Sequence, residues 1–321
     1  MMQVYEDKRL SLSALSSKKI AVLGFGSQGR AQALNLKDSG LTVCIGLRAK
    51  SRSHTTAKNL GFQVWDIATA VMRSDIILVL LPDEAHPDVF QKEILPHWHP
   101  SKILGFAHGF SIVFKTIGLP KNSKYFLLAP KGPGYLVREK FLEGSGVAAA
   151  VAWGQAEIKS IALAYGKAIG ATRALLFKTT FEEEVFSNLF SEQCVLPGGI
   201  NEILKKGFEV LVEAGISPLM AYFECFYKLP FVADFLQKKG FSGTAQSISP
   251  IATYGALSQG PFIIDASTKH RMKVILQNIK KGTFAKSWLK EYQKGQPHFR
   301  KLLEQEKNHP LEKFIKQKLS Y

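Results

Sequence analysis

Cysteine is scarce in this sequence, and the few cysteines form no recognisable pattern. Cys44, Cys194 and Cys225 are the three present, an odd number without the spacing of a zinc site or a disulfide framework. No apolar run approaches the roughly 18–20 residues that a membrane-spanning helix needs, and residues 1–19 lack the apolar core of a signal peptide. We therefore expect a cytoplasmic protein with reduced thiols and no membrane association.

Acidic residues are also in the minority. The 26 Asp and Glu residues stand against 42 Lys and Arg, which gives a formal net charge of +16. Such a charge raises the question of nucleic-acid binding. The basic segment from His270 onward, however, has lysines between helically spaced apolar residues, which is typical of a solvated amphipathic face. No zinc-finger, RNA-binding-sheet or basic-zipper signature is present, so we expect a small anionic substrate and no nucleic-acid partner.

The two halves of the chain carry different hydrophobic patterns. Short apolar runs typical of buried parallel strands recur, between helical stretches, at 20–23, 41–48, 74–82, 101–110, 125–134 and 147–153. Beyond about residue 181 amphipathic helical patterns dominate. We therefore predict an α/β domain with a doubly wound parallel sheet over residues 1–181 and an all-α domain over residues 182–321.

A glycine-rich turn follows the first predicted strand directly. Gly24, Gly26 and Gly29 form the pattern G-x-G-x-x-G between a strand and a helix. In a Rossmann domain the first glycine allows the tight turn, the second lets a pyrophosphate approach the backbone, and the third lets the helix pack closely on the strand. A turn that binds nothing is the alternative, but the strand–turn–helix context favours dinucleotide binding at the helix N-terminus.

The end of the second predicted strand lacks the acidic residue that would hold the ribose 2′-hydroxyl of NAD. Its sequence, "GLRAKSRS", carries Arg48, Lys50, Ser51, Arg52 and Ser53 instead. Cations and hydroxyls suit a 2′-phosphate. The sequence therefore predicts NADP(H) as the cofactor, with an ordinary basic surface loop as the alternative.

Two helical segments of the second half carry polar side chains four residues apart. Asn188 and Glu192 lie in "VFSNLFSEQ", and Glu224 and Lys228 lie in "AYFECFYKL". This spacing places each pair on one helical face. The residues themselves leave three interpretations open: the remains of a metal site, a rebuilt catalytic site, or ordinary surface polarity.

A family resemblance runs over nearly the whole chain. The motifs that carry it, in order, are "GFGSQGRAQALNLKDSG", "LLPDEAHPDVF", "FAHGFSI", "APKGPGYLVRE", "EQCVLPGG", "GFEVLVEAG", "AYFEC", "SIS" and "GTFAKSWLKEYQKGQPHF". With them the chain resembles ketol-acid reductoisomerase in its short, class I form. The resemblance implies an NADPH-binding Rossmann domain, a knotted helical C-terminal domain and an intertwined homodimer. It also implies alkyl migration in 2-acetolactate or 2-aceto-2-hydroxybutyrate, followed by reduction with NADPH, in branched-chain amino-acid synthesis.

The resemblance assigns site residues one by one. His108 matches the residue often assigned as the active-site histidine, Lys131 the site lysine, and Ser249 the serine that contacts the substrate. His86 stands where the family usually has a glutamine. The cofactor-binding positions implied in this way are Gly24, Phe25, Gly26, Ser27, Gln28, Gly29, Arg48, Ser51, Ser53, Asp83, Glu84, Ala85, His86 and Gly134.

This sequence departs most from the family pattern at the metal site. The resemblance implies two Mg²⁺ ions bridged by an aspartate and a glutamate on one helix and two glutamates on another. Here Asn188 and Lys228 take two of these positions, and only Glu192 and Glu224 remain. An ammonium about 4 Å from a divalent ion repels it by several kcal/mol, even at an effective dielectric constant of about 20. We therefore expect the two-ion site to be lost, with one weakly held ion between Glu192 and Glu224 as the remaining alternative.

Lys228 leads to a functional hypothesis. An ammonium donates hydrogen bonds to a carbonyl oxygen and stabilises the alkoxide formed on hydride transfer, whereas alkyl migration needs oxygens polarised by metal ions. The sequence therefore predicts an NADPH-dependent oxidoreductase for a small 2-keto or 2-hydroxy-3-keto acid, with Glu192, Glu224 and Lys228 among its catalytic residues. Two alternatives stay open: a Mg²⁺-dependent ketol-acid reductoisomerase, and a non-catalytic NADPH-binding homologue.

Overall fold

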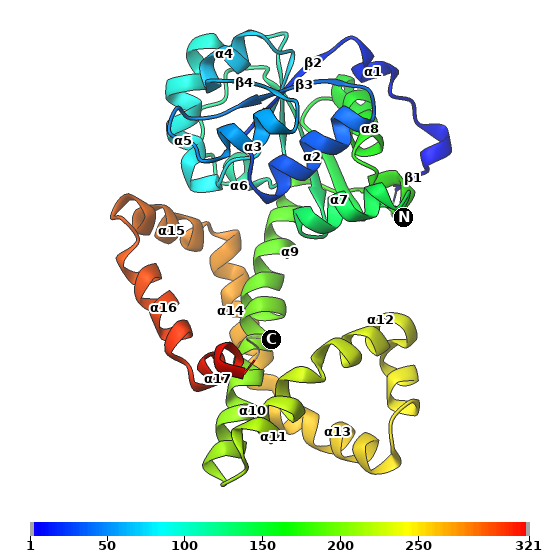
Figure 1. The fold of residues 1–321 in the computed structure, drawn as a ribbon, viewed down its shortest axis with the longest axis vertical. Coiled ribbons are helices and arrows are strands. Elements are labelled where there is room, and N and C mark those ends of the chain that lie inside the picture. Colours follow the sequence, from blue (N-terminus) through cyan, green and yellow to red (C-terminus); the bar gives the residue numbers. More distant parts are fainter. Residues whose placement is uncertain (1–2, 319–321) are drawn as a thin grey trace. The chain divides into compact units, whose positions relative to one another are not determined.

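The structure is a computed structural model that describes residues 3–318. The chain falls into two compact units, whose boundary lies between Val185 and Phe186. The first unit is an α/β domain and the second is helical (Figure 1). No helix among residues 3–318 combines the length and apolar character needed to cross a membrane.

The first unit is built on one nine-stranded sheet. The strand order is β1-β9-β8-β7-β6-β5-β2-β3-β4. All six predicted strands are confirmed, while β1, β4 and β9, each of two or three residues, were not predicted. The strands are β1 (Val4–Tyr5), β2 (Lys19–Leu23), β3 (Thr42–Gly46), β4 (Gln63–Trp65), β5 (Ile76–Val79), β6 (Ile103–Phe106), β7 (Lys124–Pro130), β8 (Ala149–Trp153) and β9 (Leu176–Lys178).

The direction of the strands changes at one side of the sheet. β4, β3, β2, β5, β6 and β7 are parallel, as predicted for a doubly wound domain. β8 runs antiparallel to β7, and β1 runs antiparallel to β9. The carboxyl end of β7 therefore lies beside the amino end of β8. The helix between them, α7 (Gly134–Leu142), stays on this side of the sheet.

Alternating side chains of the central strands form a core on each face of the sheet. In β2, Ile20 and Val22 face one core while Ala21 and Leu23 face the other, because successive side chains of a strand point to opposite faces. The first core is covered by α1 (Ser13–Ser16), α2 (Ser27–Asp38) and α8 (Lys159–Ala168). The second is covered by α4 (Ile67–Met72), α5 (His86–Val89) and η3 (Phe90–Ile94).

Short helical segments complete the first unit. They follow strands at the edges of the sheet or link larger helices. They are η1 (Asp7–Arg9), α3 (Ser53–Asn59), η2 (Asp83–Ala85), η4 (Leu95–His97), α6 (Phe110–Val113), η5 (Ala156–Ile158) and η6 (Ala171–Arg173).

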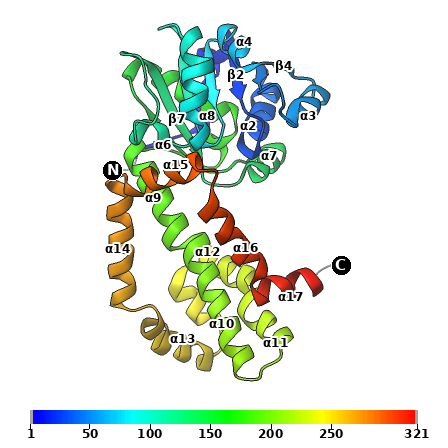
Figure 2. The ribbon, with the colours of Figure 1, turned by 90° about the vertical axis from the view of Figure 1, so that its left-hand side faces the viewer.

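The second unit is helical throughout its described residues. A small core forms where α10, α11 and α17 meet (Figures 1 and 2), around Phe208, Tyr222 and Leu311. By contrast, α12 and α13 bury no side chain within this chain. The elements, beginning with the helix that enters from the first unit, are α9 (Phe181–Cys194), η7 (Leu196–Ile200), α10 (Asn201–Glu213), α11 (Pro218–Tyr222), η8 (Phe223–Tyr227), α12 (Leu229–Gln246), α13 (Pro250–Ile263), α14 (Ala266–Lys280), α15 (Thr283–Gln293), α16 (Pro297–Asn308) and α17 (Pro310–Lys318).

A buried amide fixes α2 in the first unit. Asn35 on α2 is fully buried, and its Nδ2 donates to the carbonyl oxygens of Val137 in α7 (3.2 Å) and Ile169 at the end of α8 (3.1 Å). Its Oδ1 accepts from Nη1 of Arg138 (2.9 Å). Because both amide hydrogens and the amide oxygen are used within the protein, α2 is held against α7, beside which it lies in Figure 1, and against α8.

Replacing this amide is expected to destabilise the first unit. Asn35→Ala leaves two buried carbonyls and the Arg138 guanidinium without this partner, so the free energy of unfolding should fall by about 2–4 kcal/mol. Urea denaturation followed by circular dichroism measures the change. Asn59→Ala, at an exposed position at the end of α3, is the matched control and should change it by less than about 0.5 kcal/mol. Equal losses in the two variants would contradict the assignment.

Candidate functional site

The glycine turn after β2 has the geometry of a phosphate cradle. Gly24 has φ +93°, and a Cβ there would lie 2.8 Å from the carbonyl oxygen of Leu80. A Cβ on Gly29 would lie 2.5 Å from the carbonyl oxygen of Gly24, whereas one on Gly26 would meet no protein atom within 4 Å. Gly24 and Gly29 therefore serve the turn and the packing of α2, while Gly26 presents bare backbone to open space. This matches the separate requirements of a pyrophosphate-binding turn.

A cavity of about 480 Å³ opens in front of this turn. Its walls come from the segments that follow β2, β3, β5, β6 and β7, so it lies at the carboxyl ends of the strands and at the point where the strand order reverses. Ligands of open α/β sheets bind at this position. The predicted cofactor residues that line it are Gly24, Phe25, Gly26, Ser27, Gln28, Arg48, Ser51, Ser53, Asp83 and His86.

Four predicted cofactor residues do not line the cavity. Gly29 lies buried beneath the turn. Gly134 begins α7 and its N–H donates to Oγ of Ser27 (3.1 Å), so it supports the turn from behind. Glu84 and Ala85 belong to η2, of which only Asp83 is among the lining residues.

The loop after β3 offers groups that fit a 2′-phosphate. Arg48, Ser51 and Ser53 line the cavity, whereas Lys50 and Arg52 of the same loop do not. No carboxylate from this loop faces the cavity. A guanidinium with two hydroxyls suits a phosphate monoester better than a ribose diol.

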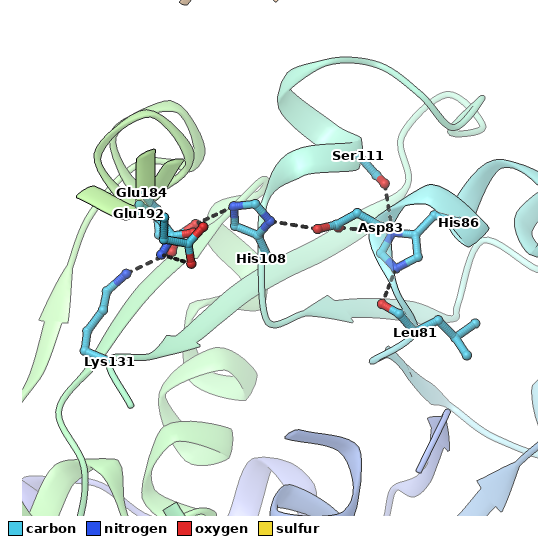
Figure 3. A network of polar contacts seen from close by, with 9 residues as sticks. Leu81, Asp83, His86, His108, Ser111, Lys131, Glu184 and Glu192 are labelled. Atoms are coloured by element: carbon cyan, nitrogen blue, oxygen red, sulfur yellow. Dashed lines mark hydrogen bonds and ion pairs between the residues drawn. The ribbon is translucent and has the colours of Figure 1, made fainter. Parts of the chain in front are cut away.

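Four ionisable side chains form a chain of contacts at the carboxyl ends of β5, β6 and β7 (Figure 3). Nδ1 of His108 lies 2.8 Å from Oδ2 of Asp83, and its Nε2 lies 3.9 Å from Oε2 of Glu184. Nζ of Lys131 donates to Oε1 of Glu184 (2.8 Å). Because a carboxylate only accepts, the Asp83 contact places a proton on Nδ1 of His108. The predicted catalytic residues His108 and Lys131 are thus brought together through Glu184.

Glu184 was missed by the sequence reasoning. It is the last acid of "FEEEVF" and lies in the first turn of α9, four residues before Asn188. Its side chain is only 3% exposed, unlike those of Glu182 and Glu183 beside it. Its position four residues before Asn188 placed it on the same helical face and could have indicated a site residue. Acidic residues are, however, common in the first turn of any helix, so three in a row did not single out Glu184.

The predicted residues of the second unit form short-range pairs. Nδ2 of Asn188 lies 3.4 Å from Oε1 of Glu192, four residues further along α9. Nζ of Lys228 donates to Oε2 of Glu224 at 2.5 Å, again across four residues. The side chains of Lys228 and Glu224 are 54% and 48% exposed. Ser249 is exposed and caps α13, where its Oγ accepts from the N–H of Ala252.

These donors do not fit a site for two Mg²⁺ ions. Each remaining carboxylate faces a hydrogen-bond donor four residues away, an amide at Glu192 and an ammonium at Glu224. Turning the Asn188 amide around would place its oxygen against a carboxylate oxygen, so the donor orientation is the favourable one. Mg²⁺ requires several hard, anionic oxygen ligands in octahedral geometry. Among residues 3–318 no three His, Cys, Asp or Glu side chains gather as a metal-binding group.

The Lys131–Glu184 pair yields a stability prediction. In Lys131→Met the nearly buried Glu184 carboxylate loses its cation, and the free energy of unfolding should fall by about 2–4 kcal/mol. Adding Glu184→Gln should recover most of this loss, because a neutral amide costs less to bury than a carboxylate. Chemical denaturation of the two single variants and the double variant measures the coupling.

The control is another lysine–glutamate pair in the same unit. Lys124 lies 3.0 Å from Glu157, whose side chain is 60% exposed. Lys124→Met should lower the free energy of unfolding by less than about 1 kcal/mol. Additive effects of Lys131→Met and Glu184→Gln would show that the two side chains do not depend on one another.

The comparisons with known proteins cover both units. Residues 14–175 match the family model for "Acetohydroxy acid isomeroreductase, NADPH-binding domain", and residues 181–319 match that for "Ketol-acid reductoisomerase, C-terminal domain". Proteins named ketol-acid reductoisomerase (NADP(+)) are 46% identical over 316 residues in Pyrobaculum neutrophilum and 47% identical over 315 residues in Petrotoga mobilis. These matches span 98% and 97% of this chain, and 97% and 96% of the relatives.

A solved structure agrees over the full length. The NADH-preferring ketol-acid reductoisomerase from an uncultured archaeon is 40% identical, with a TM-score of 0.95 and coverage of 100% of both chains. Two family models on consecutive halves, relatives well above 30% identity and one fold shared from end to end agree. The chain belongs to the ketol-acid reductoisomerase family.

Proposed function

We propose that this protein is an NADP(H)-dependent oxidoreductase that reduces a small 2-keto or 2-hydroxy-3-keto acid. The observation that carries the proposal is one cavity lined both by the glycine cradle with Arg48, Ser51 and Ser53 and, at its other side, by Asp83 and His108. Residues 1–181 would hold the cofactor and residues 182–321 would supply Glu192, Glu224, Lys228 and Ser249. A cytoplasmic location follows from the reduced thiols expected of Cys44, Cys194 and Cys225.

The cofactor preference rests on the loop after β3. The relatives in Pyrobaculum and Petrotoga are named for NADP(+), whereas the archaeal structure is named as NADH-preferring. Family membership alone therefore does not select the cofactor. The Arg48 guanidinium and the hydroxyls of Ser51 and Ser53 in the cavity wall favour the phosphorylated form.

Removing Arg48 should weaken NADPH binding selectively. We expect Arg48→Ala to raise the Kd for NADPH about 10- to 100-fold, since one charge-assisted contact to phosphate is worth about 1.5–3 kcal/mol, and to change the Kd for NADH less than threefold. Quenching of protein fluorescence measures both constants. Arg52→Ala removes the same charge from the same loop outside the cavity and is the control. An equal effect of Arg48→Ala on both cofactors would contradict the 2′-phosphate assignment.

The residues around the cavity have complementary roles. Bound NADPH would supply the hydride. His108, held by Asp83, keeps a fixed orientation with its Nδ1–H engaged. Beside them, Glu184 provides a buried carboxylate that can take up a proton, and Lys131 provides an ammonium that can donate to a substrate oxygen.

Lys228 would replace part of the metal chemistry of the family. Its ammonium is exposed enough to leave Glu224 and donate to a substrate carbonyl oxygen, and it would stabilise the alkoxide that hydride transfer creates. A single ammonium offers no means of holding a tertiary alkoxide and a ketone together on two metal ions, as alkyl migration requires. Reduction without migration is therefore the activity we assign.

Chelation and substitution test this role. We expect NADPH oxidation with a 2-keto acid to be unaffected by EDTA, and Lys228→Ala to lower kcat about 10²-fold, since one lost oxyanion donor typically costs about 10²–10³ in rate. Asn188→Asp combined with Lys228→Glu restores four carboxylates and should bind Mg²⁺ in isothermal titration calorimetry, whereas we expect no uptake by the unchanged protein. Lys238→Ala, which breaks an exposed lysine–aspartate pair on α12, is the control.

Mg²⁺-dependent conversion of 2-acetolactate by the unchanged protein would favour the second candidate. In that case the chain is a full ketol-acid reductoisomerase, the activity for which its relatives of 46–47% identity are named. Tight NADPH binding without oxidation on any keto acid would instead indicate a non-catalytic homologue.

A homo-oligomer is part of the proposal. Large apolar side chains on α13 are exposed within this chain, including Ile251 at 82%, Leu257 at 68% and Phe262 at 80%. Apolar surface of this extent is typical of a protein interface. A second copy of the chain, as the family resemblance implies, would cover it.

A further inference from the structure

His86 is buried at the cofactor cavity but has no part in the chemistry assigned above. Its side chain is 3% exposed and lines the cavity wall. Neither hydrogen bond of this imidazole goes to the loops after β2 and β3, so its position has another reason. Its two ring nitrogens supply one, because both are engaged by groups of the protein (Figure 3).

The ring links the two loops that follow β5 and β6. Nε2 lies 3.0 Å from the carbonyl oxygen of Leu81, in the loop after β5. Nδ1 lies 2.8 Å from Oγ of Ser111, which is on α6 just beyond His108. A carbonyl only accepts, so Nε2 carries the proton. In a neutral ring Nδ1 is then unprotonated and accepts a hydrogen bond from the Ser111 hydroxyl. Ser111 itself is 1% exposed, so water does not compete at this end.

The same two loops carry Asp83 and His108. The hydrogen bond between these residues, 2.8 Å long, is thus a second link running parallel to the first. Oδ1 of Asp83 lies 3.7 Å from Nδ1 of His86. One carboxylate therefore faces two imidazoles, one through each oxygen.

We propose that His86 is a positioning residue, whose neutral ring locks the loops after β5 and β6 together and thereby keeps the Asp83 carboxylate directed at His108. The inference rests on the proposed function, since it concerns the orientation of the residue that would face the substrate. At this position the resemblance described above implies a glutamine.

Protonation of His86 would break this arrangement. A proton on Nδ1 removes the acceptor for Ser111 and places a positive charge beside Asp83, in competition with His108. Burial is the main reason why the pKa of His86 lies below its usual value, with His108 acting in the same sense and the carboxylates of Asp83 and Glu84 opposing it. The neutral ring is therefore lost at a lower pH than in an ordinary histidine.

Turnover and its pH profile separate positioning from mere packing. His86→Leu removes both links and should lower kcat at least tenfold while changing the KM for the keto acid less than threefold. His86→Gln retains one donor and one acceptor, so it should restore kcat at pH 7.5 to within about threefold. Glutamine does not titrate, so the acid limb of the pH–kcat/KM profile should lose one ionisation in His86→Gln. A wild-type kcat in His86→Leu, or an unchanged acid limb in His86→Gln, would overturn the proposal.

A measurement without turnover separates this proposal from the proposed reaction. The ¹⁵N shifts of the ring nitrogens report which nitrogen carries the proton, in a protein with no substrate added. We expect His108 to hold its proton on Nδ1 in the unchanged protein and in His86→Gln, and to become a mixture of tautomers in His86→Leu. A fixed His108 tautomer in His86→Leu would disprove positioning even if no keto acid is ever reduced. His99→Leu, which removes an exposed histidine also bonded to a serine hydroxyl, is the control.

Discussion

The close approach of α2 to the end of β2 is the constraint on which the cofactor site depends. A methyl group on Gly29 would lie 2.5 Å from the backbone oxygen of Gly24, so the helix can begin where it does only because no side chain intervenes. That placement directs the first N–H groups of α2 into the cavity. The buried amide of Asn35 then fixes the same helix against α7 and α8, and α7 in turn brings Gly134 against Ser27.

The carboxyl ends of the parallel strands gather the remaining groups. Each of β5, β6 and β7 is followed within four residues by a polar residue: Asp83 after β5, His108 after β6 and Lys131 after β7. Because parallel strands present these ends on one side of the sheet, three residues spread over about fifty positions of the sequence join one chain of contacts: His108 and Lys131 both lie against Glu184, and Asp83 holds His108. The antiparallel return of β8 ends this series, since its own carboxyl end points the other way.

Sequence reasoning recovered the parts of the molecule governed by local pattern. Continuous apolar runs predicted the six longer strands, and glycine spacing with a basic second loop predicted the wall of the cofactor cavity. The short strands β1, β4 and β9 escaped because two or three residues carry no periodicity. The burial of Glu184 escaped for a different reason: its neighbours Glu182 and Glu183 are chemically identical and exposed, and only the packing of α9 distinguishes the three. The links made by His86 depend on the carbonyl of Leu81 and the hydroxyl of Ser111, and no motif encodes such a contact.

The polar pairs of the second unit change how that unit is held together. Asn188 pairs with Glu192 and Lys228 pairs with Glu224, each within a single helical turn. Such pairs form as soon as the local helix forms and close no loop. Metal ions shared by carboxylates of two helices would act instead as a cross-link between distant segments, reducing the conformational freedom of the unfolded chain and coupling folding to ion binding. With the two-ion site lost, as we propose, no metal cross-link holds α9 and η8, and the stability of the helical unit should be independent of the magnesium concentration around it.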